Sequence, residues 1–171
     1  MEDQITLQRI ALMHPNLRNE VEHIYRTKIV SALTGRAMCR FSYTLRTFAE
    51  QNTLFAQGRT KLYDSNGKRL GIVTKAKGGQ SYHNFGLALD IVLIKDDKTA
   101  SWETNIDFDK DGRADWMEVV QIFKNAGWEW GGDWRFKDAP HFQKTFGFST
   151  KELLAKHNAG NFIAGTTYVN I

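Results

Sequence analysis

The segment from Leu87 to Ile94 constrains the fold more than any other, because it is almost entirely apolar. Large aliphatic side chains occupy alternate positions in it, as is typical of a buried β-strand. Asp90 is the one charged residue of the segment, so the strand would present a single carboxylate on one face. Gly86 comes directly before the segment and permits a sharp bend of the backbone.

Two histidines accompany this aspartate in the sequence. His83 lies an odd number of residues before Asp90, so only a bend such as one at Gly86 could bring both to the same face. A second strand around His141 would place His141 and Gln143 on one face and could bring His141 up to Asp90. Two imidazoles and a carboxylate are a common zinc ligand set, and three protein ligands leave the fourth position for water.

A further carboxylate, Asp138, precedes His141 by three residues. It can lie beside a metal without being a ligand, which suits a general base acting on water. Spacing alone leaves structural roles open, because a lone histidine or aspartate is usually structural and this spacing also arises by chance.

The combined pattern resembles a known family. Ser-x-His-x-x-Gly-x-Ala-x-Asp, from Ser81 to Asp90, is followed by Asp-x-x-His-Phe from Asp138. These motifs resemble the LAS-type metallopeptidases, which comprise D-alanyl-D-alanine carboxypeptidases, D-alanyl-D-alanine dipeptidases and L-alanyl-D-glutamate endopeptidases. The resemblance runs from about residue 5 to residue 148. It implies an α+β fold in which a small antiparallel sheet, packed with helices, carries zinc, as in hedgehog domains and D-Ala-D-Ala peptidases. It also implies that His83, Asp90 and His141 are the zinc ligands and Asp138 is the base.

An arginine joins this predicted site. Thr47 and Glu50 form a capping-box pattern that predicts a helix, so Arg46 stands where a strand meets a helix. The resemblance implies that Arg46 stabilises the oxyanion, although the family's Gly-Tyr before this arginine is Thr44-Leu45 here. A surface ion pair is the alternative role for Arg46. The residues predicted to contact substrate or support the site are Gln51, Ser81 and Trp130.

The tryptophan-rich stretch Trp128–Trp134 allows two interpretations. At least two of its three tryptophans are expected in the core or in a wall, whereas one or two could line a peptide groove. Asp133 in this stretch is the rival to Asp138 as base. Asp138 is preferred because its spacing from His141 matches the acid-x-x-His motif of the family.

Residues 107–118 match the calcium loop of an EF-hand. Acidic residues stand at positions one, three, five, nine and twelve, and glycine stands at position six. The predicted ligands are Asp107, Asp109, Asp111, Asp115 and Glu118, with Arg113 contributing its carbonyl. Some phage endolysins of the same family resemble the chain here too. The simpler alternative is an acidic loop before a helix, with Asp115 near the positive end of the helix dipole.

The rest of the sequence predicts mainly helices. The expected elements are helices within 4–33 with a break at His14-Pro15, a strand over 38–43, helices from 47 to about 57 and from 115 to about 126, and a short helix over 149–157. With 171 residues, a single metallopeptidase domain over 1–171 is expected.

Charge and termini favour a partner in the bacterial envelope. The net charge is +4, yet no basic run and no nucleic-acid-binding motif stands out. The N-terminus lacks the pattern of a secretion signal, and no apolar run is long enough to span a membrane. We therefore expect a monomer made in the host cytoplasm, without stable membrane insertion, that acts on peptidoglycan in the periplasm or cell wall after release by another factor.

The function that follows from the resemblance is zinc-dependent hydrolysis of the L-alanyl-D-glutamate bond in stem peptides, as in single-domain phage endolysins that cause cell lysis. Gln57-Gly58-Arg59-Thr60 resembles an element of the endopeptidase branch. The alternatives are a D-alanyl-D-alanine carboxypeptidase and, from a different class, a non-catalytic hedgehog-like binding domain. Zinc and calcium are the expected cofactors.

Overall fold

The computed structural model describes residues 2–171, which form two compact units. The first unit contains the residues up to Thr44 together with Leu87–Lys144, and the second contains Leu45–Gly86 and Thr145–Ile171. Each unit therefore combines two separate stretches of the chain.

An antiparallel sheet forms the framework of the first unit, in the order β1-β2-β5-β4, with β3 paired to β2. The strands are β1 (Ala37–Tyr43), β2 (Ala88–Lys95), β3 (Ala100–Ser101), β4 (Glu129–Trp130) and β5 (His141–Gln143). The predicted strands over 38–43 and 87–94 and around His141 are thus confirmed.

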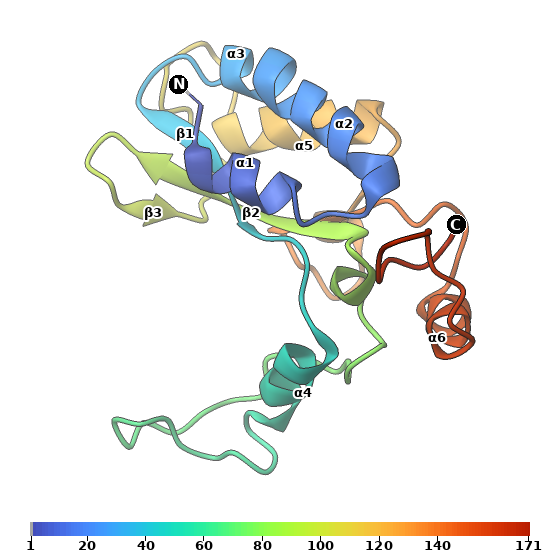
Figure 1. The fold of residues 1–171 in the computed structure, drawn as a ribbon. Helices are drawn as coiled ribbons and strands as arrows, with labels where there is room; N and C mark the ends of the chain where they lie inside the picture. The colour runs from blue at the N-terminus through green and yellow to red at the C-terminus, as the bar shows by residue number, and fades with distance from the viewer. Residues whose placement is uncertain (1) are drawn as a thin grey trace. The chain divides into compact units, whose positions relative to one another are not determined.

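The helices of this unit are α1 (Gln4–Ile10), α2 (Pro15–Ile24), a π-helical turn (Tyr25–Ile29), α3 (Val30–Ala32) and α5 (Asp115–Asn125). The predicted break at His14-Pro15 is confirmed, since Pro15 begins α2 at the position where a missing N–H costs nothing. The rings of Tyr25 and Phe123 both contact Phe41 of β1, at 5.6 and 6.1 Å between centroids. The helices that carry them therefore pack on the same side of the sheet (Figure 1).

The two faces of the sheet differ in character because side chains alternate along β2 and β5. Leu89 of β2 lies opposite Phe142 of β5, and both are fully buried in the core. Phe142 also packs against Phe123 of α5, with 4.9 Å between ring centroids. The next pair in the register, Asp90 and His141, consequently lies on the face directed away from this core.

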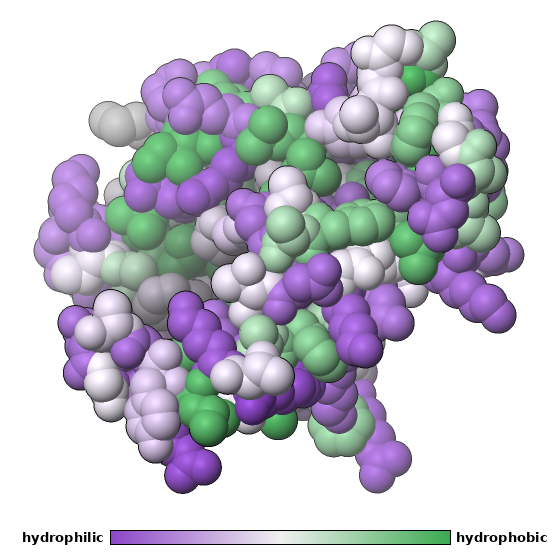
Figure 2. Space-filling view, turned by 60° about the horizontal axis from the view of Figure 1, so that its bottom comes forward, coloured by the Kyte–Doolittle hydropathy of each residue, from purple (hydrophilic) through white to green (hydrophobic). Residues whose placement is uncertain are grey.

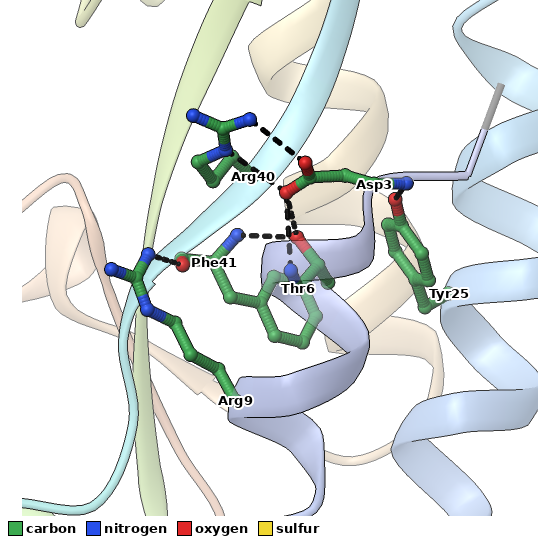
Figure 3. A network of polar contacts seen from close by, with 6 residues as sticks. All are labelled: Asp3, Thr6, Arg9, Tyr25, Arg40 and Phe41. Atoms are coloured by element: carbon green, nitrogen blue, oxygen red, sulfur yellow. Dashed lines mark hydrogen bonds and ion pairs between the residues drawn. The ribbon is translucent and has the colours of Figure 1, made fainter.

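A buried polar network fixes the N-terminal helix to β1 (Figure 3). Asp3 caps α1 by accepting from the Thr6 amide at 3.1 Å, and it accepts two hydrogen bonds from the Arg40 guanidinium at 2.8 and 2.9 Å. The Asp3 amide donates to the hydroxyl of Tyr25 at 2.7 Å, and the Phe41 amide donates to Thr6 Oγ1 at 3.1 Å. The Asp3 carboxylate therefore joins a helix cap to an edge strand, and the Asp3 amide adds a contact to a second helical segment.

The second unit consists of α4 (Phe48–Ala56), a 3₁₀ turn (Tyr82–Phe85), α6 (Thr150–Asn158) and long connecting segments. The predicted capping box of Thr47 and Glu50 is present at the start of α4. Phe48 packs against Phe85 and His157, at 5.9 and 4.7 Å between centroids, and so joins the three helical elements. This aromatic contact gives His157 a packing role.

Hydrophilic and hydrophobic residues are mixed over the face of the molecule shown in Figure 2. Among residues 2–171, no helix has both the length and the apolar character needed to cross a membrane.

Candidate active site

The centre of the candidate site is the pair of Asp90 and His141. They lie directly opposite each other on β2 and β5, and Asp90 Oδ1 is 3.2 Å from His141 Nδ1. His141 is buried, and burial by itself would lower the pKa of the imidazole. The hydrogen bond and the negative charge of Asp90 outweigh that effect and raise the pKa. Strand register, as predicted, brings the two residues together.

The other ring nitrogen of His141 has a partner that the sequence analysis did not assign to the site. His141 Nε2 lies 3.1 Å from Gln143 Oε1, and Gln143 Nε2 donates to Glu129 Oε2 at 2.9 Å. The rule that alternate residues share a strand face pointed to Gln143, but no sequence signal pointed to Glu129.

This arrangement fits the donor requirements of zinc. Ligands bound tetrahedrally at about 2.0–2.1 Å lie about 3.3 Å apart, close to the 3.2 Å between Asp90 Oδ1 and His141 Nδ1. Since His141 Nε2 faces Gln143, Nδ1 is the ring nitrogen on the side of Asp90. Carboxylate oxygen and imidazole nitrogen are both common zinc ligands.

The turn that carries Asp138 is tied to a glycine. The Asp138 amide donates to the Gly131 carbonyl at 2.9 Å, and the His141 amide donates to the Asp138 carbonyl at 3.1 Å. A Cβ atom on Gly131 would lie 2.4 Å from the Asp138 carbonyl oxygen and 3.2 Å from His141 Cβ. Only glycine fits there. Asp138 itself is exposed to solvent.

The tryptophans near this turn have different surroundings. Trp130 donates its indole N–H to the Ala139 carbonyl at 2.7 Å and so supports the turn between Asp138 and His141. Trp128 is buried in the core, whereas the Trp134 ring lies 5.2 Å from the His141 ring. Trp134 is therefore the tryptophan of this stretch that stands beside the candidate ligands.

The rival carboxylate, Asp133, is engaged elsewhere. Its side chain forms an ion pair with Lys124 at 2.7 Å, and both partners are well exposed. The Asp133 carboxylate is therefore directed toward Lys124, near the end of α5.

Arg46 and His83 belong to the second unit. His83 is buried in the 3₁₀ turn, and its carbonyl accepts from the Arg46 amide at 2.9 Å. Gly86 ends the turn with a φ of 69°, a left-handed conformation that suits glycine and redirects the chain into β2. The bend predicted at Gly86 is confirmed.

Two buried amides organise this part of the second unit. Gln51 accepts from Arg46 Nη1 at 2.9 Å and donates to the Ala76 carbonyl at 2.9 Å, so it positions the guanidinium. Asn84 donates to the Arg46 carbonyl at 2.9 Å and accepts from the Ser81 amide at 3.2 Å. Asn84 was not among the predicted site residues, and its contact with Arg46 spans 38 residues, so no local pattern reveals it.

The predicted calcium loop lies in the first unit, directly before α5. Its carboxylates already hold backbone amides of the loop: Asp107 accepts from Gly112 at 2.9 Å, and Asp111 accepts from Arg113 at 2.8 Å. Gly112 has a φ of 96°, which allows the sharp turn at position six. The loop is also fixed from outside, because the Thr34 amide donates to Asp109 Oδ2 at 3.0 Å.

Three of the loop carboxylates converge. Asp107, Asp109 and Asp115 each offer an oxygen, and these oxygens all lie within 4.8 Å of one another. Asp115 Oδ1 and Glu118 Oε2 are buried atoms that have no hydrogen-bond partner in the structure. Burial, followed by repulsion from the neighbouring carboxylates, raises the pKa of Glu118 to about 7.

Comparison with known proteins places these residues in a family context. Residues 74–144, which include His83, Asp90, Asp138 and His141, match the family model described as D-alanyl-D-alanine carboxypeptidase. The peptidoglycan L-alanyl-D-glutamate endopeptidase CwlK of Bacillus subtilis (strain 168) is 50% identical over 99 residues, which cover 57% of this chain and 55% of that protein. The L-alanyl-D-glutamate peptidase of Listeria phage A118 is 40% identical over 74 residues, which cover 42% of this chain and 24% of that protein. The chain thus spans about half the length of the first relative and about a quarter of the second.

A solved structure extends the likeness to most of the chain. The L-Ala D-Glu endopeptidase ChiX of Serratia marcescens is similar with a TM-score of 0.51 and 24% identity, over 84% of this chain and 88% of that one. This likeness confirms the predicted α+β fold with a small antiparallel sheet. Together, these comparisons confirm that the chain resembles the family of D-alanyl-D-alanine carboxypeptidases and L-alanyl-D-glutamate endopeptidases.

Proposed function

We propose that the chain is a zinc-dependent peptidoglycan hydrolase that cleaves the L-alanyl-D-glutamate bond of stem peptides, as a phage endolysin does. The observation that carries the proposal is the pair of Asp90 and His141, held 3.2 Å apart across two strands within the segment that matches the peptidase family. The names of the two curated relatives, both L-alanyl-D-glutamate peptidases, support this choice of bond.

The proposed zinc ligands are His83, Asp90 and His141, each of which offers one ligand atom for a metal ion. Zinc bound there would polarise the scissile carbonyl and acidify a water molecule. Asp138 accepts the proton of that water and later delivers it to the leaving amine, so that the base also serves as the acid. Its position in the turn directly before His141 supports this role.

The other proposed site residues act on substrate or on each other. Arg46 stabilises the negative charge that develops on the carbonyl oxygen, and Gln51 orients its guanidinium through the 2.9 Å hydrogen bond. Ser81 contacts substrate or a ligand. Trp130 supports the site because its indole N–H donates to the carbonyl of Ala139, in the turn that also contains Asp138.

The products from purified peptidoglycan test the reaction and separate the alternatives. L-alanyl-D-glutamate cleavage leaves L-alanine on the glycan and releases peptides that begin with D-glutamate, as mass spectrometry would detect. Free D-alanine instead would identify a carboxypeptidase. If neither product appears, although metal analysis shows one zinc per chain, a hedgehog-like binding domain is favoured. No zinc after purification, and no activity gained on adding it, would refute the zinc site.

We also propose that residues 107–118 bind calcium through Asp107, Asp109, Asp111, Asp115 and Glu118, and through the carbonyl of Arg113. The convergence of three carboxylates and the two buried oxygens without partners support this proposal. Calcium would neutralise the mutual repulsion of these groups and order the loop against the start of α5. α5 leads to β4, which pairs with the strand of His141, so an ordered loop would also stabilise the catalytic strand.

A titration separates a structural calcium site from an activating one. Calcium is buffered from nanomolar to millimolar with zinc fixed, and peptidoglycan hydrolysis and calorimetric binding are measured in parallel. Calcium binding together with rising hydrolysis supports both a calcium site and activation by calcium. Calcium binding with an unchanged rate of hydrolysis leaves a structural site and refutes activation. Glu118→Gln should weaken binding, while Glu103→Gln, a carboxylate outside the loop, should not. Equal binding by both variants would contradict the proposed ligand set.

A further inference from the structure

A row of polar side chains crosses the face of the sheet that bears the proposed zinc ligands. The register places Glu129 of β4 opposite Gln143 of β5, and Asp90 of β2 opposite His141 of β5. His141 and Gln143 are two residues apart on one strand and so share a face. Hydrogen bonds connect the row without interruption: Glu129 to Gln143, Gln143 to His141 and His141 to Asp90.

The chemistry of Glu129 decides the direction of every hydrogen bond in the row. An ionised carboxylate only accepts, so the amide nitrogen of Gln143 must face Glu129, and it does so at 2.9 Å. The amide oxygen of Gln143 then faces His141, and an amide oxygen also only accepts. His141 must therefore carry a proton on Nε2, so that Nδ1, which faces Asp90, is the ring nitrogen left to bind a metal.

We propose that Gln143 and Glu129 are positioning residues that hold His141 as the Nε2–H tautomer and thereby prepare Nδ1 to bind zinc. The inference rests on the zinc site proposed above. Gln143 and His141 are only 7% and 8% exposed, so water cannot readily replace either partner. Ala88, which lies opposite Gln143 on β2, is fully buried and leaves room for the amide on this face. Without this partner, the imidazole would populate more than one tautomer and rotamer, and zinc binding would have to select one of them.

The expected size of the effect follows from other metal sites. Removal of the partner that orients a metal-binding histidine typically costs roughly 10- to 100-fold in metal affinity. Gln143→Met keeps similar volume without an acceptor and should weaken zinc binding by about that factor. Glu129→Gln leaves the Gln143 amide free to rotate, and its effect should be smaller, because Glu129 is exposed and water can take its place.

The first test reads the tautomer without metal. Two-bond ¹⁵N–¹H spectra of the zinc-free protein report which nitrogen of each imidazole carries the proton, and loss of a signal in His141→Ala identifies His141. The native protein should show a proton fixed on Nε2, and Gln143→Met should lose that proton in part, in favour of the form protonated on Nδ1 beside Asp90. A mixture already in the native protein, or an unchanged Nε2–H form in Gln143→Met, would overturn the proposal. Because no zinc is present, this result is independent of the proposed hydrolase activity.

The second test uses an exchange of the two groups. The double substitution Glu129→Gln with Gln143→Glu again provides an acceptor to His141 and a donor to that acceptor. It should restore zinc affinity to within a few-fold of the native value, whereas Gln143→Met should not. Gln121→Met, on the exposed surface of α5, is the matched control and should bind zinc normally. Failure of the exchange to improve on Gln143→Met, with thermal stability of the zinc-free proteins unchanged, would show that hydrogen-bond polarity is irrelevant and overturn the proposal.

Discussion

Replacing Asp3 should destabilise the first unit through two separable contributions, the helix cap and the ion pair with Arg40. Asp3→Ala removes a helix cap, worth about 1 kcal/mol. It also removes the carboxylate that pairs with Arg40, whose side chain is 26% exposed. Loss of one partner of a fully buried pair costs about 3–5 kcal/mol, and the partial exposure of Arg40 reduces this to about 2 kcal/mol. The total is about 3 kcal/mol, or a fall in Tm of roughly 6–12 °C for a chain of this size.

Asp3→Asn isolates the charge, because asparagine caps helices about as well as aspartate. We expect this variant to have a free energy of unfolding about 2 kcal/mol below the native value, since its amide nitrogen would face the donors of Arg40. Stability is measured by urea unfolding and by Tm at pH 7, with Asp97→Asn in an exposed turn as the matched control. A double-mutant cycle with Arg40→Gln gives the coupling directly. Coupling near zero, or an Asp3→Asn variant as stable as the native chain, would refute this reasoning.

The pH dependence provides a second check on Asp3. Burial alone would raise the pKa of this carboxyl, but the hydrogen bonds from Arg40 and Thr6 outweigh it and lower the pKa. A depressed folded pKa stabilises the protein above the unfolded value, near 3.8, and this contribution disappears as the pH falls through the folded value. The Tm gap between native chain and Asp3→Asn should therefore be constant near neutral pH and narrow below about pH 4.

Three further predictions concern the site and the loop. Asp138→Asn should lower peptidoglycan hydrolysis by roughly 10²–10⁴-fold with zinc still bound, whereas Asp133→Asn should stay near the native rate; the reverse result in an activity assay would mean that the base was misassigned. Gly131→Ala should displace the turn of Asp138 from His141, because the added Cβ meets a carbonyl oxygen at 2.4 Å. Hydrolysis should therefore fall even at temperatures where the variant is still folded, and native activity would contradict this. Since the pKa of Glu118 is raised to about 7, calcium affinity should fall as the pH drops below about 7, with proton uptake by the free loop; calorimetry showing pH-independent binding from pH 5 to 8 would exclude this.

Much of the site was predictable because its determinants are local. Alternation of apolar residues around Asp90 predicted β2 and its buried face, and the Asp-x-x-His spacing predicted that Asp138 would adjoin His141. The capping box of Thr47 and Glu50 predicted the start of α4, which in turn placed Arg46 at its N-terminus. In each case the relevant interaction spans only a few residues, so the sequence pattern contains it.

Other features depend on contacts between distant segments, and no pattern reveals them. Gly131 reads as an ordinary turn residue, yet it is required because the turn of Asp138 passes within van der Waals distance. Asn84 ties Ser81 to Arg46 across 38 residues of sequence. The π-helical turn over Tyr25–Ile29 interrupts a segment for which the sequence predicted helix.

The polar row of the sheet depends both on local sequence patterns and on contacts between distant segments. Local alternation predicts that His141 and Gln143 share a face, but it gives no partner for Gln143, and an unpartnered amide cannot fix the orientation of an imidazole. Glu129 belongs to a strand of two residues, too short to be recognised by periodicity, and its position opposite Gln143 depends on the register of β4 with β5. A shift of one residue in that register would turn the carboxylate to the opposite face and place Trp130 beside the amide. Since Trp130 is held by its bond to the Ala139 carbonyl, the same turn that carries Asp138 also sets the register that brings Glu129 to Gln143.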